Sequence, residues 1–263
     1  NGQQNKEIIG TENDIFAIEH DFSDSSSTSG LRSLYSLLSA RHERKELLLG
    51  ARVPQTDDNI TLNGSYGRFD EIILKEKQAT DYFLLVGPPG TGKTSCALRF
   101  MVEEALTDEN TSILLLSYTN RAVDEICSML VDSGIAEKNP FIRIGNEMSC
   151  DRRYTEYLMK YRISDCSKLT DIKKRITETR IFVGTTTSVN GRLNLFDIKH
   201  FELAIIDEAS QILEPDIIGI LAARSGNMNA IDKFVLIGDY KQLPAIALQN
   251  TEDAKVTEPI LNN

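Results

Sequence analysis

Six short runs rich in isoleucine, leucine and valine recur along the chain from residue 82 onward. Segments whose apolar residues follow helical spacing separate these runs. Alternation of this kind is typical of a parallel sheet that is covered by helices on both faces. We therefore expect an α/β fold. The predicted strands are Tyr82–Val86, Ser112–Ser117, Phe141–Ile144, Arg180–Val183, Glu202–Ile206 and Lys233–Ile237.

The part of the chain before residue 82 is polar at first and then helical. Residues 1–30 end in the sequence DFSDSSSTSG, a composition typical of a flexible linker. Apolar residues then follow helical spacing from Leu31 to Leu49, and Gly50 ends the pattern. A second helix is predicted over residues 67–80.

The composition is that of a soluble globular protein, with 41% hydrophobic and 26% charged residues. No apolar run approaches the ~18–20 residues that cross a bilayer, and the first ten residues lack the apolar core of a signal peptide. The four cysteines and three histidines are scattered, whereas zinc and iron–sulfur sites need clustered ligands. We expect a soluble, cytoplasmic protein with reduced thiols and without such a metal site or a membrane partner.

The net charge of −10 argues against a chain that holds nucleic acid by bulk electrostatics. Residues 146–183 are the exception, with nine basic and six acidic side chains and with tyrosines among the basic ones. Basic groups interleaved with aromatic rings suit a phosphate backbone and stacked bases. Alternatively, the segment is a solvated helical insertion, since Tyr154, Leu158 and Tyr161 recur at helical spacing and would face the core.

A complete phosphate-binding pattern follows the first predicted strand. The sequence GPPGTGKT at residues 87–94 matches G-x-x-x-x-G-K-[ST], and a helical pattern comes directly after it. Its glycines let the backbone wrap closely around an anion, while Lys93 supplies a positive charge and the Thr94 hydroxyl is a ligand for Mg²⁺. We predict a nucleotide site here. Its candidate residues are Gly87, Pro88, Pro89, Gly90, Thr91, Gly92, Lys93, Thr94 and Ser95.

Two further predicted strands end in polar groups suited to nucleotide chemistry. Asp207 and Glu208 follow the strand Glu202–Ile206, and acidic groups at the carboxyl end of a parallel strand lie at the edge where such sheets bind ligands. Asp207 can hold Mg²⁺, and Glu208 can deprotonate a water that attacks the γ-phosphate. After Lys233–Ile237 comes GDYKQLP, in which Gln242 could sense the γ-phosphate.

These residues resemble a known family. GPPGTGKT at 87–94, LLLSYTNRAVDEI at 114–126, VGTTTS at 183–188, IIDEASQ at 205–211 and LIGDYKQLP at 236–244 are similar to motifs I, Ia, Ic, II and III of superfamily 1 helicases. The most similar branch is superfamily 1B, that of the nonsense-mediated-decay RNA helicase and the Okazaki-fragment nuclease-helicase. The resemblance covers about residues 60–250, the first of the family's two RecA-like domains.

The resemblance implies an ATP-dependent enzyme that uses ATP and Mg²⁺. Lys93 and Thr94 would bind phosphate and Mg²⁺, Asp207 would bind Mg²⁺, Glu208 would be the catalytic base, and Gln242 would couple the γ-phosphate to the nucleic acid. The polynucleotide would be single-stranded DNA or RNA. Its track would run over Ser117, Tyr118, Thr119, Asn120, Thr185, Thr186 and Thr187. Helix capping is an alternative role for such polar residues.

The implied domain plan has three parts. Residues 1–60 would be an N-terminal extension with a Ser-rich linker and a helix, and residues 61–250 a RecA-like P-loop NTPase domain. A basic helical insertion would occupy about 146–180, where the family often carries one after a position matched by Arg143. Residues 251–263 would begin the connection to a second RecA-like domain that this chain lacks, because nothing after Pro244 resembles the later motifs. We expect a monomer.

One position departs from the family pattern. The family usually carries a glutamine that reads adenine in a Leu-Asn-x-x-Gln stretch, and here Tyr66 stands at that position. Tyr66 is therefore a candidate to stack on the base. Two other functions remain open: a nucleotide-responsive module that binds nucleic acid or protein without turnover, and another type of P-loop NTPase, such as a nucleoside kinase.

Overall fold

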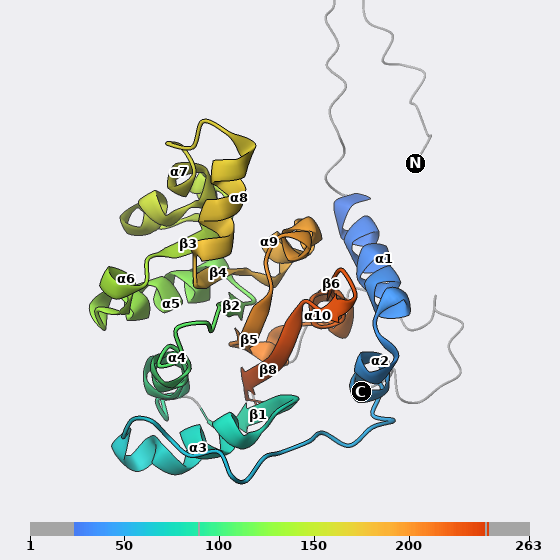
Figure 1. Cartoon of the computed structure of the whole chain (residues 1–263), viewed down its shortest axis with the longest axis vertical. Helices are drawn as coiled ribbons and strands as arrows, with labels where there is room; N and C mark the ends of the chain where they lie inside the picture. Colours follow the sequence, from blue (N-terminus) through green and yellow to red (C-terminus); the bar gives the residue numbers. More distant parts are fainter. Residues whose placement is uncertain (1–23, 89, 240, 242–263) are drawn as a thin grey trace, which may run out of the picture.

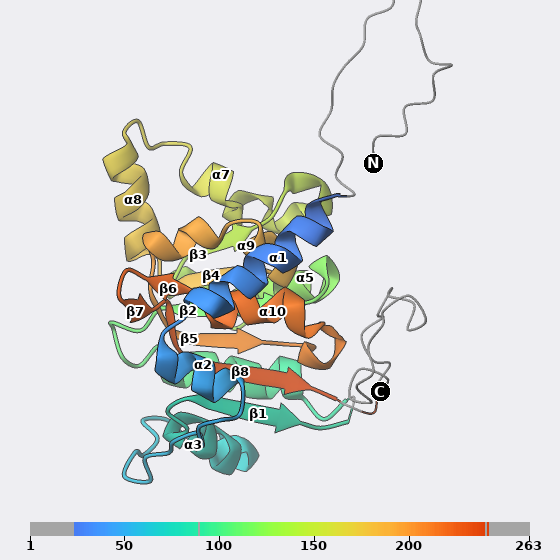
Figure 2. The same ribbon diagram turned by 90° about the vertical axis from the view of Figure 1, so that its right-hand side faces the viewer.

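The structure is a computed structural model that describes residues 24–88, 90–239 and 241. Its centre is a six-stranded, fully parallel sheet with the order β1-β8-β5-β2-β4-β3, and Figure 2 shows β1, β8 and β5 side by side with the same direction. The predicted α/β fold is confirmed, and all six predicted strands are present to within two residues at each end. The strands are β1 (Tyr82–Val86), β2 (Ile113–Ser117), β3 (Phe141–Ile144), β4 (Ile181–Thr185), β5 (Phe201–Ile206) and β8 (Ile231–Gly238).

Helices cover both faces of the sheet (Figure 1). Alternate residues of one strand serve the two faces: Ile113 and Leu115 pack against one set of helices, and Leu114 and Leu116 against the other. Because the strands are buried on both sides, their sequences are continuously apolar. The first face carries α3 (Asp70–Gln78), α4 (Arg99–Ala105), α5 (Asn120–Asp132) and α6 (Ile135–Lys138). The second carries α2 (His42–Leu48), α8 (Leu169–Glu178), α9 (Thr186–Asn190), the 3₁₀ turn Leu193–Asp197 and α10 (Glu214–Leu221). A short hairpin, β6 (Arg224–Ser225) and β7 (Met228–Asn229), follows α10.

The N-terminal extension is helical earlier than the sequence predicts. The linker prediction is wrong for residues 24–30, which form the first part of α1 (Asp24–Ser39); residues 1–23 lie outside the described residues. α1 lies against α10 (Figures 1 and 2), and the Gly219 amide donates to the Ser33 hydroxyl at 2.7 Å. Two small residues let the helices approach so closely, and this tertiary contact overrides the linker-like composition.

The predicted helix 31–49 is in fact two helices. α1 ends at Ser39 and α2 begins at His42, and the turn between them lets α2 reach the sheet. The Arg44 guanidinium is buried there and donates to the carbonyls of Ile231 (2.6 Å) and Asp232 (2.8 Å) on β8. The extension is thus packed on the same core as the rest of the domain.

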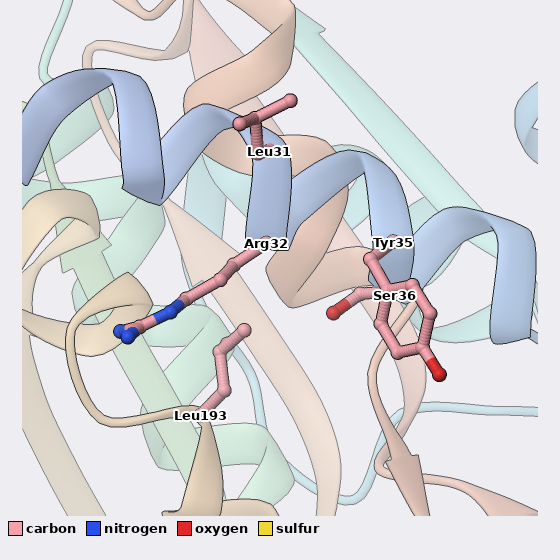
Figure 3. A pocket seen from close by; sticks show the side chains of 5 residues that line it. All are labelled: Leu31, Arg32, Tyr35, Ser36 and Leu193. Carbon is pink, nitrogen blue, oxygen red and sulfur yellow. The ribbon is translucent and has the colours of Figure 1, made fainter.

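α1 also presents apolar side chains outward. Leu31, Leu34, Tyr35 and Leu38 recur at helical spacing, and all four are exposed. Figure 3 shows Leu31, Arg32, Tyr35 and Ser36 of α1 together with Leu193 around a shallow pocket of about 350 Å³.

The segment in which the sequence predicts an insertion forms a series of short helices. It comprises the 3₁₀ turns Glu147–Ser149 and Arg152–Tyr157, followed by α7 (Met159–Arg162) and α8. Tyr154 is only 4% exposed, and Tyr157 stacks on Phe141 with ring centroids 4.1 Å apart. Two of the three tyrosines therefore pack on the domain, while Tyr161 is exposed.

The helix predicted over 67–80 divides into the 3₁₀ turn Gly67–Phe69 and α3.

Among the helices that the structure describes, none combines the length and apolar character needed to cross a membrane.

Candidate functional site

All of the predicted site residues within the described chain, except Tyr66, lie at or directly after the carboxyl ends of the parallel strands. Residues 87–94 follow β1, Asp239 follows β8, Asp207 and Glu208 follow β5, Ser117 ends β2, and Thr185 ends β4. Because these strands are parallel, the groups share one edge of the sheet. The strand order places them along that edge as phosphate loop, Asp239, carboxylates, Ser117 and Thr185.

The phosphate loop has the backbone that its glycines predict. Gly90 and Gly92 adopt left-handed conformations, with φ of 75° and 82°, which side chains with a Cβ rarely take. The Gly87 amide donates to the Gly238 carbonyl at 3.3 Å, which ties the loop to the end of β8. A π-helix, Lys93–Leu98, begins directly after Gly92 and continues into α4. Pro89, Gln242 and the side chains of Lys93, Thr94 and Ser95 lie outside the described residues.

Asp207 and Glu208 differ in their surroundings. Asp207 is 3% exposed, and its carboxylate accepts the Glu208 amide at 3.0 Å. Glu208 is half-buried and is the one non-glycine residue with a positive φ (54°) among those described. Burial raises the pKa of Glu208, and the neighbouring Asp207 charge raises it further. A carboxylate with a raised pKa is a better proton acceptor near neutral pH.

Ser117 contacts these carboxylates from the neighbouring strand. Its side chain is fully buried, and its hydroxyl lies 3.3 Å from the Asp207 carbonyl and 3.4 Å from Glu208 Oε2. The sequence predicts Ser117 on the nucleic-acid track, which stays a prediction; the structure shows its hydroxyl beside the carboxylates.

Two helices begin side by side next to Ser117. The Thr119 hydroxyl accepts the Ala122 amide at 3.1 Å and caps α5, and the Thr185 hydroxyl accepts the Ser188 amide at 3.1 Å and caps α9. Ser117 and Thr185 are register partners in adjacent strands. Both threonines therefore cap helices, which is the alternative role that the sequence left open. Helix N-termini favour anions.

The other residues of the predicted track differ in exposure. Tyr118, Asn120 and Thr187 are exposed, whereas Thr186 is buried. Of these four residues, Thr186 is therefore the one that does not lie at the surface.

Tyr66 lies in a loop that packs beside the phosphate loop. Its hydroxyl donates to Glu104 Oε2 at 2.7 Å, its ring lies 5.1 Å from that of Phe100, and Phe69, three residues later, approaches Gly92. The hydroxyl is thus engaged with α4, and one side of the ring is engaged with Phe100.

Glu104 is a residue that the sequence reading missed. It is 2% exposed and accepts from Lys77 Nζ (2.6 Å), the Asn63 amide (2.8 Å), the Gly64 amide (3.1 Å) and Tyr66. Burial alone would raise the pKa of Glu104, but these donors lower it to about 2. The sequence could have identified Glu104 as a buried residue, because it follows the apolar Met101 by three positions and so lies on the same, inner face of the helix.

Arg143 is almost fully buried and reaches from β3 to α5. Its guanidinium pairs with Asp124 of α5 and donates to the Ser149 carbonyl at 3.3 Å. The sequence reading gave Arg143 no chemical role. The structure shows that it anchors the helix whose N-terminus holds Thr119.

A metal site made by protein alone is not seen within the part of the chain that the structure describes, where no three His, Cys, Asp or Glu side chains gather. Mg²⁺ in nucleotide enzymes commonly takes one or two protein oxygens together with substrate phosphates and waters. The buried Asp207 carboxylate, on the same edge of the sheet as the phosphate loop, fits that kind of site.

Comparison with known proteins finds a matching family and several similar proteins. The chain matches the AAA_11 family, described as an AAA domain, over residues 70–181 and 167–250. DNA replication ATP-dependent helicase/nuclease JHS1 of Arabidopsis thaliana is 38% identical over 182 residues, which are 69% of this chain and 12% of that protein. DNA replication ATP-dependent helicase/nuclease DNA2 of Saccharomyces cerevisiae is 33% identical over 176 residues, 67% of this chain and 11% of that protein. The chain thus spans only about a ninth to an eighth of these relatives.

Comparison with solved structures finds matches of low similarity that include helicases. T4 UvsW has a TM-score of 0.47 and 16% identity, over 79% of this chain and 37% of that chain. Arterivirus nonstructural protein 10 (helicase), solved with DNA, has a TM-score of 0.37 and 17% identity, over 67% of this chain and 33% of that chain.

Proposed function

Since the chain belongs to the AAA_11 family and is the first RecA-like domain of a superfamily 1B helicase, we propose that it is the ATP-binding half of a nucleic-acid motor. In this proposal it hydrolyses ATP with Mg²⁺ and couples hydrolysis to single-stranded nucleic acid. The curated relatives act in DNA replication by name, so we favour DNA over RNA as that strand. That the protein is a monomer and is cytoplasmic stays a prediction from the sequence.

One observation carries the proposal. The strand order places Asp207 and Glu208 between the phosphate loop on one side and the N-termini of α5 and α9 on the other. A side chain at this position can contact a bound nucleotide on one side and a bound polynucleotide on the other.

The chain's residues divide the chemistry as follows. The main chain of residues 87–94 and Lys93 would hold the triphosphate. Asp207 and Thr94 would hold Mg²⁺, which supplies positive charge to the phosphates when bound. Glu208, with its raised pKa, would take the proton from the attacking water. Gln242 would contact the γ-phosphate from the segment after β8.

The polynucleotide would lie across the ends of β2 and β4. Tyr118, Asn120 and Thr187 are exposed there, and the N-termini of two helices lie beside them. Contacts of this type bind sugar and phosphate without reading sequence. Many charges of the basic insertion are engaged in local ion pairs, as between Arg175 and Asp165 or Lys160 and Glu147, which disfavours the insertion as the main binding surface.

The test is ATP hydrolysis by this chain and by the full-length protein, with and without single-stranded DNA or RNA. We expect strand-stimulated hydrolysis in the full-length protein, and weak hydrolysis by this chain, because an arginine supplied by a second RecA-like domain can contribute ~10³–10⁵ in rate. Lys93→Ala should abolish nucleotide binding, and Glu208→Gln should lower kcat by roughly 10²–10⁴ without loss of binding. If the protein binds single-stranded nucleic acid equally well with and without ATP, and does not hydrolyse ATP, it is a binding module instead.

A further inference from the structure

α1 carries a row of large apolar side chains on a side that α10 does not cover. The row recurs at helical spacing and therefore lies along one face of the helix. The exposed fractions of its four side chains run from 47% to 73%. α1 packs on α10 elsewhere, where the Gly219 amide donates to the buried Ser33 hydroxyl. We call the exposed row the α1 stripe; it consists of Leu31, Leu34, Tyr35 and Leu38.

One end of the α1 stripe borders a pocket of about 350 Å³. The pocket is lined by Leu31, Arg32, Tyr35 and Ser36 of α1 and by Leu193 of the 3₁₀ turn before β5. Figure 3 shows the Arg32 side chain on one side of the pocket and Tyr35 on the other. Arg32 is a cation, and the lining includes no acidic residue. A contiguous exposed apolar patch marks a contact surface, and this one suits an apolar segment with negative charge.

The patch is small for a contact between separate molecules. Stable protein–protein interfaces take about 20–30 residues from each partner, whereas the α1 stripe and its pocket together comprise seven. A second copy of the chain would also bring a second Arg32 to the same patch, and like charges repel. A segment of the same chain needs less area, because its effective concentration is roughly millimolar. The occupant that fits is therefore a segment attached to α1.

Residues 1–23 directly precede α1 and have the composition that the patch requires. They contain five acidic and one basic side chain, a net charge of −4. The helix from Asp24 to Leu38 is about 21 Å long at ~1.5 Å per residue, and about seven extended residues at ~3.3 Å each span that length. The segment is therefore long enough to return along the whole α1 stripe. Its large apolar residues are Ile8, Ile9, Ile15, Phe16, Ile18 and Phe22.

We propose that residues 8–22 of this chain fold back on α1 and cover the α1 stripe. Their apolar side chains pack on the stripe, and their acidic side chains lie near Arg32. α1 is then held between this segment on one side and α10 on another, so that its exposed face becomes part of a small second core. Neither a nucleotide nor a nucleic-acid strand takes part in this contact. The inference therefore goes beyond the proposed function and does not rest on it.

The experiment is thiol labelling of the full-length protein with N-ethylmaleimide, in which mass spectrometry of peptides identifies each labelled site. Leu38→Cys places a thiol in the α1 stripe, and Met148→Cys places one at a residue that is 100% exposed. We expect the thiol of Leu38→Cys to react about tenfold more slowly than that of Met148→Cys, a modest protection for a locally stable contact. The fully buried Cys127 should stay unlabelled in every variant, which shows that the domain remains folded.

The double change Phe16→Asp with Ile18→Asp tests whether residues 8–22 are the occupant. A carboxylate is costly to bury without a partner, so the labelling rate of Leu38→Cys should rise at least about fivefold in this background. The rate of Met148→Cys should stay the same.

Gln3→Asp with Gln4→Asp is the matched control for the double change. It adds the same charge to residues 1–23 but leaves every apolar residue in place. Leu38→Cys should keep its slow labelling rate in this background. Faster labelling here, equal to that with Phe16→Asp and Ile18→Asp, would show that charge alone displaces the segment and would contradict the apolar contact.

Three other results would overturn the proposal. Thiols of Leu38→Cys and Tyr35→Cys that both react as fast as that of Met148→Cys would show that nothing covers the α1 stripe. Slow labelling that persists with Phe16→Asp and Ile18→Asp would assign the stripe to another part of the full-length protein. Slow labelling that is lost on about hundredfold dilution would assign it to a second copy, because only a contact between molecules depends on concentration.

Discussion

At the scale of single residues, Glu104 shows how one buried carboxylate organises a loop. Four donors converge on it, two of them main-chain amides of Asn63 and Gly64. Buried charges are stable when paired and fully hydrogen-bonded, and Glu104 meets both conditions through Lys77 and Tyr66. The loop that carries Tyr66 is therefore attached to α4, the helix that continues from the phosphate loop.

Glu104→Gln should destabilise the protein in a pH-dependent way. The folded-state pKa of Glu104, about 2, lies below its ordinary value of 4.5, so its contribution is present above pH ~4.5 and is lost as pH falls towards 2. At neutral pH the loss should be at most about 3 kcal/mol. Denaturant unfolding of both proteins from pH 7 to pH 3 measures the difference, which should shrink below pH 4.5.

Glu103→Gln is the control for this prediction. Glu103 is the preceding residue, and its pairing with Arg99 is partly exposed, so its loss should cost under about 1 kcal/mol. Equal losses in the two variants, or a difference that does not change with pH, would contradict the role given to Glu104.

At the scale of elements, α5 is held in place by a buried ion pair. Arg143 of β3 is 1% exposed, and its partner Asp124 lies in the second turn of α5. The pair fixes the helix whose first residues include the exposed Asn120. Its geometry requires β3 and α5 to pack together, and this packing is not visible in either segment alone.

Arg143→Met should destabilise the protein strongly. The change leaves the Asp124 carboxylate without its buried partner, which typically costs about 3–5 kcal/mol, and the partial exposure of Asp124 points to the lower end. Thermal and urea unfolding measure the effect. Arg121→Met, one helical turn away in an exposed pair with Glu125, should change stability by less than about 1 kcal/mol; a comparable loss there would count against the buried pair.

The elements also show what could be read from the sequence. Strand positions such as Tyr82–Val86 and Phe141–Ile144 were predicted at their observed bounds, because apolar runs between turn residues are local signals. The contacts of Ser117, Glu104 and Arg143 were not predicted, because each joins separate segments that become neighbours only through tertiary packing. The linker reading of residues 24–30 failed because the packing of α1 on α10 overrode local composition.

At the scale of the whole molecule, the strand order brings motifs that are separate in the sequence to one edge of the sheet. The family resemblance noted in the sequence is confirmed by the match over residues 70–181 and 167–250. The order β1-β8-β5-β2-β4-β3 places the last described strand, β8, between the first and the fifth. No local pattern encodes that insertion, yet it brings Gly238 against the phosphate loop.

The packing of α1 on the domain should depend on Gly219. A Cβ at this position would lie 2.7 Å from Ser33 Cα and 2.4 Å from its hydroxyl, so Gly219→Ala should destabilise the protein by about 1–3 kcal/mol, despite alanine's better helix propensity. Thermal unfolding and proteolysis near α1 measure this. Gly191→Ala, where a Cβ meets ordinary contacts at 3.6 Å, should be tolerated; equal behaviour of the two variants would refute the close approach.

The central claim is that nucleotide chemistry and a nucleic-acid strand meet at Glu208. The most direct measurement is the ATP hydrolysis rate of the full-length protein as single-stranded DNA is titrated, in the wild type and in Glu208→Gln. The account predicts a saturable rise in the wild type and a rate lower by roughly 10²–10⁴ at every DNA concentration in the variant. A wild-type rate that does not change with DNA or RNA, or a Glu208→Gln rate equal to it, would contradict the account.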